Sequence, residues 1–253
     1  ALNALKRFME TGERDERLLG IDLPDIPLWA IWAIQQYAKT YGRDEARRRY
    51  FPVVKEIITY ILAGKHPYLG IDENGMVTTN GSDKPMSWMN ASLGGRPIVP
   101  RTGYLVEFNA LWYNALVFGS RLAEGDEALV ADAEAWTAVA EKIKPAFTDK
   151  FLNDYGYLYD YVAGTYADPS VRPNMAVAIG LDYTPLDRRQ RKGVLDVVTR
   201  ELLTPKGLRT LSPKSYGYRP FYVGSPEDRE MALHNGPARP WLMGFYADAY
   251  LKV

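Results

Sequence analysis

The chain has 253 residues, of which 47% are hydrophobic, so it is long enough to bury a sizeable core. Its 31 basic and 31 acidic side chains leave no net charge, which removes the electrostatic case for a nucleic acid or anionic membrane partner. The absence of cysteine excludes disulfides and thiolate metal sites, and it favours a reducing, cytoplasmic compartment.

Helical periodicity dominates the chain, and each predicted helix is placed from its apolar spacing and its end signals. The second helix, for example, begins at Pro27, which suits a first turn, and ends at Gly42, which suits a C-terminus. In chain order, the pattern predicts helices over 2–12, 27–42, 44–64, 102–123, 126–148, 173–180, 187–203 and 230–251.

Strand signals are sparse. Residues 70–79 favour a small hairpin around the turn formed by Asp72 to Gly75, and little else alternates. No low-complexity linker divides the chain, so we expect one all-α domain over residues 1–253.

The connections between the predicted helices alternate between short and long. The long ones cover 65–101, 150–171 and 204–228. In a stack of antiparallel helix pairs, all short links lie at one end and all long loops at the other. The first helix of each pair is rich in Trp, Ala and Asn, whereas the second carries most of the charge. This contrast favours an inner and an outer layer of helices.

A closed ring of this type needs six helix pairs, and we count about three and a half in this sequence. We therefore expect an (α/α)6 toroid whose N-terminal helix pairs are absent from this chain or supplied by another. An open α-solenoid is the alternative, but no repeat in the sequence supports it.

If the long connections share one end of the molecule, their polar and aromatic side chains also meet there. Arginines, amides and carboxylates form paired hydrogen bonds with neighbouring hydroxyls, and aromatic rings stack on sugar faces. This combination favours a neutral polyol as the ligand. The candidates at this end are Asp25, Trp29, Trp88, Asn90, Arg101, Asp160, Arg172, Asn174, Arg209, Tyr216, Tyr218, Tyr222, Arg229, His234, Asn235 and Trp241.

Several of these side chains have a structural alternative. Trp29 and Trp112 fall at helical spacing that also suits a core residue. Loop arginines commonly cap carbonyls or pair with aspartates, and His234 is equally suited to structural hydrogen bonding. Glu107 lies near the start of an otherwise apolar helix, where a buried carboxylate needs either a partner or a catalytic role. Arg101 is the partner that a structural role predicts.

Other site types find no support in the sequence. The two histidines are far apart, so a His-rich metal site is not expected. No phosphate loop of the GxxxxGK or GxGxxG type occurs, which argues against nucleotide chemistry, and we expect no cofactor. No apolar run approaches the roughly 20 residues that cross a bilayer, so we expect no membrane partner.

Six phrases occur together, in the order PLWAIWAIQQY, SWMNA, GRPIVPRTGYLVEFNALWYNAL, LYDYV followed by VRPN, LLTPKGLRTLSP and DREMALHNGPARPWLMGFY. In these phrases the chain resembles the C-terminal amylo-α-1,6-glucosidase domain of the glycogen-debranching enzyme family. The resemblance covers nearly the whole chain. It implies an (α/α)6 toroid, of which roughly the last two-thirds is present here.

The resemblance also implies a reaction. The family hydrolyses the α-1,6-linked glucosyl stub at a glycogen branch and inverts the anomeric centre. Such a reaction needs a protonated carboxyl group and an ionised one, roughly 6.5–9.5 Å apart. The implied partner is a branched α-glucan or a maltooligosaccharide, and Asn109 and Trp112 join the candidates for binding it.

The sequence departs from the family's pattern at two positions. Where the family has the motif T-W-M-D-A, Asn90 occupies the position of the presumed acid, and a carboxamide cannot protonate a glycosidic oxygen. Where eukaryotic members have H-Q-G-P-E-W, Ala238 replaces the glutamate suited to the base.

These departures leave more than one function open. In the first, Asn90 is a sugar-binding amide at the catalytic site and other carboxylates react, with Glu107, Asp160 and Asp83 as candidates. In the second, the domain has lost hydrolysis and serves as a glucan-binding module. A helical scaffold that binds partners through its loops is a third alternative.

Overall fold

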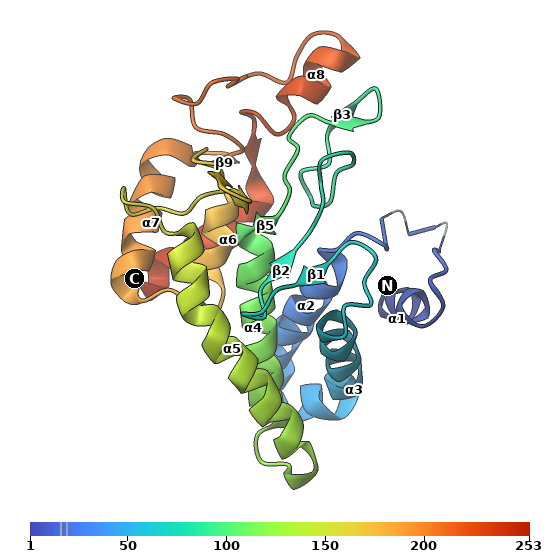
Figure 1. Cartoon of the computed structure of the whole chain (residues 1–253). Coiled ribbons are helices and arrows are strands. Elements are labelled where there is room, and N and C mark those ends of the chain that lie inside the picture. The colour runs from blue at the N-terminus through green and yellow to red at the C-terminus, as the bar shows by residue number, and fades with distance from the viewer. Residues whose placement is uncertain (16, 19) are drawn as a thin grey trace.

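The computed structural model describes residues 1–253 except residues 16 and 19. Helices dominate this described part of the chain, as Figure 1 shows, so the all-α expectation is confirmed. The α-helices are α1 (Leu2–Thr11), α2 (Ile26–Tyr41), α3 (Arg43–Leu62), α4 (Val106–Ala123), α5 (Val130–Phe151), α6 (Asn174–Gly180), α7 (Arg188–Leu202), α8 (Pro226–Ala232) and α9 (Met243–Lys252). Two short 3-10 helices, η1 (Glu127–Leu129) and η2 (Pro240–Leu242), precede α5 and α9.

The strands are two or three residues long and all of their pairings are antiparallel. They are β1 (Gly70–Ile71), β2 (Val77–Thr78), β3 (Ser92–Leu93), β4 (Arg96–Pro97), β5 (Tyr104–Leu105), β6 (Tyr161–Ala163), β7 (Tyr166–Ala167), β8 (Leu203–Thr204), β9 (Gly207–Arg209) and β10 (Ala238–Arg239). The β1–β2 pairing confirms the predicted hairpin. The β5–β6 pairing was not expected, and it joins the first long connection to the second.

Two predicted helices begin later than the sequence pattern indicates. The helix expected from residue 102 begins at Val106, because Tyr104 and Leu105 pair with β6 instead. Gly103 precedes them with a φ of 76°, and a Cβ atom there would meet the backbone of Ala163 at 3.0 Å. The helix expected from residue 126 starts as η1 and continues as α5 only from Val130.

The prediction of one last helix over 230–251 is wrong. Helix α8 ends at Ala232, and β10 and η2 come before α9 starts at Met243. Gly236 and Pro237 interrupt the helical pattern, and Pro240 has no N–H group for a continuous helical ladder. The backbone N–H of Gly236 instead donates to Thr210 Oγ1 at 2.8 Å, which attaches this segment to the residue directly after β9.

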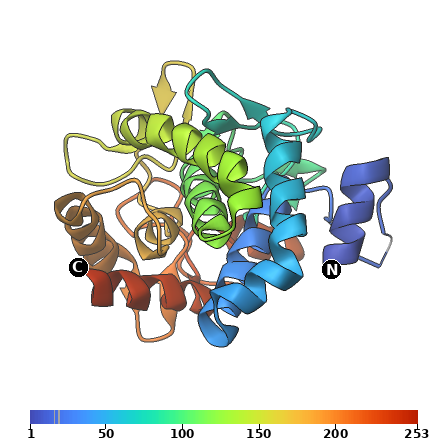
Figure 2. The ribbon, with the colours of Figure 1, turned by 90° about the horizontal axis from the view of Figure 1, so that it is seen from below.

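The helices form two layers around α4. Fifteen residues of α4 are buried, and the helix packs against α2, α3, α5 and α6. Helix α6 in turn packs against α7 and α9. Figure 2 shows α3, α5 and α7 outside α4 and α6. The apolar helices therefore lie inside, and the charged sequences of α3 and α7 lie outside.

The long connections gather at one end of the molecule. In Figure 1 the segments that carry β3, β9 and α8 lie at the top, whereas the short α2–α3 and α4–α5 links lie at the bottom. Besides the β5–β6 pairing, residues of β3 contact α8, so the first and third connections also touch. The alternation of short and long links thus brings distant polar residues to a common end.

Candidate functional site

Arg101 lies at the centre of a buried group of charged side chains. Its Nη1 and Nη2 atoms donate to Glu107 Oε1 and Oε2 at 2.5 and 2.7 Å, and its Nε atom donates to Asp160 Oδ2 at 2.6 Å. The three side chains are at most 2% exposed. Arg101 thus joins the first long connection to α4 and to the second connection. We call these three residues the charged centre.

Burial sets the electrostatics of the charged centre. It raises the pKa of Glu107, and the charge and hydrogen bonds of Arg101 oppose that rise. Burial also disfavours the charged form of Arg101, but the charges of Asp160 and Glu107 outweigh it and raise the pKa of the guanidinium. A guanidinium between two carboxylates recovers in part the cost of burying all three charges.

A chain of hydrogen bonds leads from the charged centre to Trp88. Asn174, at the start of α6, donates from Nδ2 to Asp160 Oδ1 at 2.8 Å and accepts at Oδ1 from Trp88 Nε1 at 2.8 Å. The same Nδ2 atom lies 3.2 Å from Met89 Sδ. Asn174 therefore fixes the position of the Trp88 indole relative to the Asp160 carboxylate.

Arg172 attaches the third long connection to this group. Its Nη1 atom donates to the carbonyl oxygens of Thr210 and His234 at 3.1 and 2.7 Å, and its Nη2 atom donates to Asn235 Oδ1 at 3.2 Å. Its Nε atom has no hydrogen-bond partner among the described residues and lies 3.9 Å from Asp160 Oδ2. Burial lowers the pKa of Arg172, although Asp160 opposes this.

Four rings lie in contact with one another and form what we call the aromatic group: Trp29, Trp88, His234 and Trp241. Trp88 meets His234 and Trp241 edge to face, with ring centroids 5.2 Å apart in both pairs. Trp241 meets Trp29 edge to face at 6.0 Å. Trp241 is 45% exposed, so the aromatic group reaches the surface.

Asp25 lies beside the aromatic group, at the start of α2. The residue is 3% exposed, and its Oδ1 atom has no hydrogen-bond partner among the described residues. Burial raises the pKa of Asp25 to about 7, and the charge of Glu107 adds to this rise, while Trp29 and the backbone at Trp88 oppose it. Asp25 is therefore a buried carboxyl group with a strong tendency to hold its proton.

His234 is a second buried polar side chain of this region whose hydrogen-bonding atoms are unpaired within the described residues. It is 3% exposed, and within the described residues neither ring nitrogen has a hydrogen-bond partner. Burial lowers its pKa to about 3, and the positive charges of Arg239, Arg172 and Arg101 act in the same direction. The imidazole is therefore neutral, with one donor and one acceptor available to a polar ligand.

Two of the predicted substrate-binding residues, Asn109 and Trp112, bind the backbone around β1 and β2. Asn109 accepts a hydrogen bond from the backbone of Val77 and donates one back, both at 2.9 Å. Trp112 is fully buried and donates from Nε1 to the Gly75 carbonyl oxygen at 2.9 Å. Both side chains hold the segment around β1 and β2 against α4.

The remaining predicted residues are spread over the same end of the molecule. Asn90 is exposed, just before β3. Arg209 is half-buried in β9, where its Nη1 atom donates to the Leu203 carbonyl oxygen at 3.4 Å. Tyr216 and Tyr222 are exposed on the third connection. The structure therefore does not bring these four side chains into the hydrogen-bonded group around Arg101.

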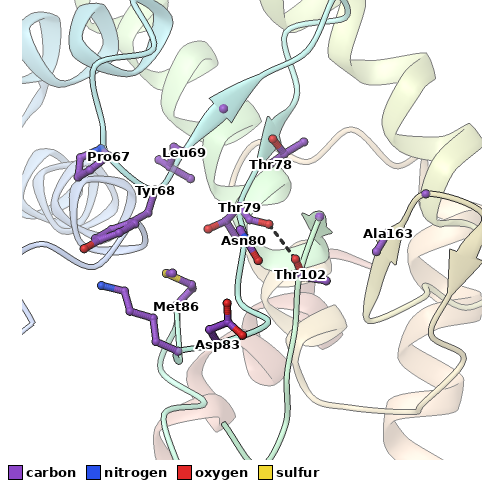
Figure 3. A pocket seen from close by; sticks show the side chains of 14 residues that line it. Pro67, Tyr68, Leu69, Thr78, Thr79, Asn80, Asp83, Met86, Thr102 and Ala163 are labelled. Carbon is purple, nitrogen blue, oxygen red and sulfur yellow. Dashed lines mark hydrogen bonds between the residues drawn. The ribbon is translucent and has the colours of Figure 1, made fainter. Parts of the chain in front are cut away.

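Asp83 lines a separate cavity of about 770 Å³, which we call the outer cavity (Figure 3). Tyr68, Thr79, Asn80 and Lys84 also line it, and Lys84 Nζ lies 3.6 Å from the centroid of the Tyr68 ring. This cavity is large enough for a small ligand. Its walls include Met86, two residues before Trp88, and Thr102, directly after Arg101, so it adjoins the two segments that carry the site.

Asp168 is a buried carboxyl group that the sequence pattern did not single out. It is 8% exposed, and its backbone carbonyl accepts from the Asp160 N–H at 2.9 Å. Burial raises its pKa, and the charge of Asp160 adds to the rise. Two aspartates that flank a short hairpin, as in YDYVAGTYAD, are the only signal that the sequence offers for this pair.

Among residues 1–253 without 16 and 19, no three acidic or histidine side chains lie close enough together to hold a metal ion. None of the helices in that part of the chain combines the length and the apolar character needed to cross a membrane.

Comparison with known proteins gives two matches. The sequence model of a family described as amylo-alpha-1,6-glucosidase matches residues 18–253. The chain is also 25% identical, over 190 residues, to the glycogen debranching enzyme of Saccharomyces cerevisiae. That alignment covers 62% of this chain but only 12% of the yeast protein, so the chain spans a small part of its relative.

Proposed function

Because this chain belongs to the amylo-alpha-1,6-glucosidase family, we propose that it hydrolyses α-1,6-linked glucosyl residues at the branch points of an α-glucan such as glycogen. Glucose is the product of this reaction. The observation that carries the proposal is the buried group in which three separate connections meet. There, carboxyl, amide, guanidinium and aromatic side chains lie together, and polar atoms of Asp25 and His234 have no partner in the described chain.

The aromatic group suits the binding of a sugar ring. Trp88 and Trp241 offer flat faces, and a pyranose ring stacks on such faces through its C–H groups. Asp25 and His234 supply the hydrogen-bond donors and acceptors that hydroxyl groups need. Asn90, which is exposed two residues after Trp88, is our candidate for a further sugar-binding amide.

The charged centre supplies the negative charge that a glycosidase needs. In an inverting reaction an ionised carboxylate activates a water molecule, while a protonated carboxyl group assists the leaving oxygen. Glu107 and Asp160 remain our candidates for the ionised role, since Arg101 holds both beside a positive charge.

The helix arrangement supports a matching proposal for the fold. We propose that α2, α4, α6 and α9 belong to the inner layer of an (α/α)6 toroid and that α3, α5 and α7 belong to its outer layer. The packing of α4 against α2 and α6, and of α6 against α9, supports this assignment. So does the position of the long connections at one end, where such a toroid holds its ligand.

A phosphorylase limit dextrin tests the proposed function directly, because its branch points end in single α-1,6-linked glucosyl residues. The purified protein is expected to release glucose from it, in excess of a heat-inactivated sample. Linear maltoheptaose, which has no α-1,6 link, should yield no glucose. Failure to release glucose from the limit dextrin would contradict the proposal.

Asn90 and Ala238 support a second candidate, a glucan-binding module without hydrolysis. It predicts that maltoheptaose or glycogen binds while no glucose is released. The Asn90→Asp variant separates the two functions. If that variant gains activity that the parent protein lacks, the parent is a binding module with a lost acid.

A further inference from the structure

Asp25 occupies the N-cap position of α2 but does not cap the helix. An aspartate at this position normally accepts a hydrogen bond from the backbone N–H of the second or third helical residue. The Asp25 side chain makes no such bond. The second residue of α2 is Pro27, which has no N–H to offer. The carboxyl group therefore does not take part in the start of the helix.

The surroundings of Asp25 disfavour its ionised form. The residue is 3% exposed, and no Arg or Lys forms an ion pair with it in the described chain. The charge that acts on it most is Glu107 from α4, which is negative and already paired with Arg101. Asp160 pairs with the same guanidinium, and the nearby His234 is neutral. A buried carboxyl without a counter-charge is more stable when it is protonated.

The direction and size of the pKa shift agree with these contacts. With a pKa of about 7, Asp25 keeps its proton on about half of the molecules at neutral pH. A general acid works best when its pKa lies close to the working pH. Among the carboxyl groups beside the aromatic group, Asp25 is the one that no arginine holds, whereas Glu107 and Asp160 both bind Arg101.

We propose that Asp25 donates the proton to the glycosidic oxygen, which is the role that Asn90 cannot fill. This inference rests on the proposed function. The O–H bond of Asp25 breaks as the proton moves to the leaving oxygen, and the bond between that oxygen and the anomeric carbon breaks with it. A water molecule attacks the anomeric carbon from the opposite face and gives its proton to an ionised carboxylate. Asp25 then regains a proton from solvent.

Two substrates separate proton donation from sugar binding. The limit dextrin has an alkoxide leaving group that needs a proton, whereas α-glucosyl fluoride releases fluoride without one. Asp25→Asn should lower kcat on the limit dextrin by about 10²–10⁴-fold and leave turnover of α-glucosyl fluoride within about tenfold of the parent protein. For the parent protein, kcat/KM on the limit dextrin should decline above about pH 7, and the decline should be absent with the fluoride.

Asp22→Asn is the matched control. Asp22 lies on the same segment and is 7% exposed, but its Oδ2 atom pairs with Arg14 at 2.9 Å. This variant should keep its activity on both substrates. The circular dichroism spectrum of Asp25→Asn should match that of the parent protein, because an amide has nearly the same shape as a protonated carboxyl group.

Three other outcomes would contradict the inference, and each would identify a different error in it. If Asp25→Asn keeps its kcat on the limit dextrin, Asp25 is not the donor. If Asp25→Asn loses activity equally on both substrates, or if only its KM rises, Asp25 binds sugar without donating a proton. If the parent protein releases no glucose from the limit dextrin, the proposed function fails and the inference falls with it. A ¹³C NMR titration gives an independent reading, because a carboxyl signal that titrates near pH 7 should disappear in Asp25→Asn.

Discussion

Arg101 binds two carboxylates that come from different parts of the chain, and all three side chains are at most 2% exposed. An isolated buried charge is costly, so the loss of one member leaves the others in an unfavourable state. The same side chain therefore stabilises the fold and sets the charge of the candidate catalytic carboxylates. This dual role separates Arg101 from the arginines of surface ion pairs.

Arg101→Met should destabilise the protein by about 3–5 kcal/mol, because Glu107 and Asp160 then lose their buried partner. Arg7→Met is the matched control, since Arg7 pairs with Glu13 on the surface with a side chain that is 69% exposed. Exposed pairs contribute little, so the control should unfold almost as the parent protein does. Urea denaturation measures both. Equal stability of the two variants would contradict the role of the charged centre.

Trp241 is the most exposed member of the aromatic group. Trp241→Ala should weaken the binding of maltoheptaose by about 5–10-fold, because aromatic stacking contributes about 1 kcal/mol. Tyr250→Ala removes an aromatic ring of α9 that is 66% exposed and lies outside the aromatic group. Isothermal titration calorimetry should find its affinity unchanged. A loss in the control that matches the loss in Trp241→Ala would place the sugar elsewhere.

Helix ends show how much of each element follows from local sequence. The Asp187 side chain accepts a hydrogen bond from the backbone N–H of Gln190 at 2.7 Å. The backbone N–H of Asp187 in turn donates to Gln190 Oε1, and the two bonds form a capping box at the start of α7. The predicted start of this helix at residue 187 therefore agrees closely with the observed one. Local signals of this type are readable because both partners lie within one turn.

Asp187→Ala should cost about 1 kcal/mol of stability, because the first turn of α7 loses its cap. Asp187→Asn keeps an oxygen in the capping position and should change stability by much less. Thermal or urea unfolding distinguishes the two variants. Destabilisation of the same size in both would mean that the charge of Asp187, and not its capping bond, supports the helix.

Other elements could not be predicted because their partners are distant in sequence. Strands β5 and β6 are two and three residues long and pair across more than fifty residues, so neither has a pattern of its own. The last helix was predicted about thirteen residues too early, since apolar spacing continues through Gly236 and Pro240, where the chain forms β10 and η2. In both cases tertiary contacts decide the local structure.

Over the whole molecule, the alternation of connection lengths carried the most information. It indicates that Arg101, Asp160, Arg172 and His234 lie at one end of the molecule, and the hydrogen bonds of Arg101 and Arg172 join the segments that carry them. Which of these side chains bind one another could not be predicted in this way. The sequence does not reveal that Arg101 takes both Glu107 and Asp160 while Asp25 stays unpaired, because such pairing depends on three-dimensional distances of a few ångströms.

His234 and Asp25 should make opposite contributions to the pH dependence of the protein's stability. The pKa of His234 is about 3 in the folded protein and 6.5 ordinarily, so the unfolded chain takes up a proton first as the pH falls. Stability therefore decreases between about pH 6.5 and pH 3. The pKa of Asp25 is about 7 instead of 3.8, so its contribution is complete below pH 3.8 and is lost as the pH rises through 7.

Urea denaturation between pH 7 and pH 4 tests these signs with two variants. His234→Gln should lose less stability than the parent protein over this range, because it removes a group that resists protonation when folded. Asp25→Asn should lose more than the parent protein, because it removes the opposing contribution. Parallel curves for all three proteins would show that neither group is buried as described.

The most direct test of the account is a crystal structure of the protein with bound maltoheptaose or limit dextrin fragments. We expect a glucosyl ring against Trp88 or Trp241, with its hydroxyl or glycosidic oxygen within hydrogen-bond distance of Asp25 and His234. A sugar bound only in the outer cavity, or at the opposite end of the helices, would contradict the assignment of this site.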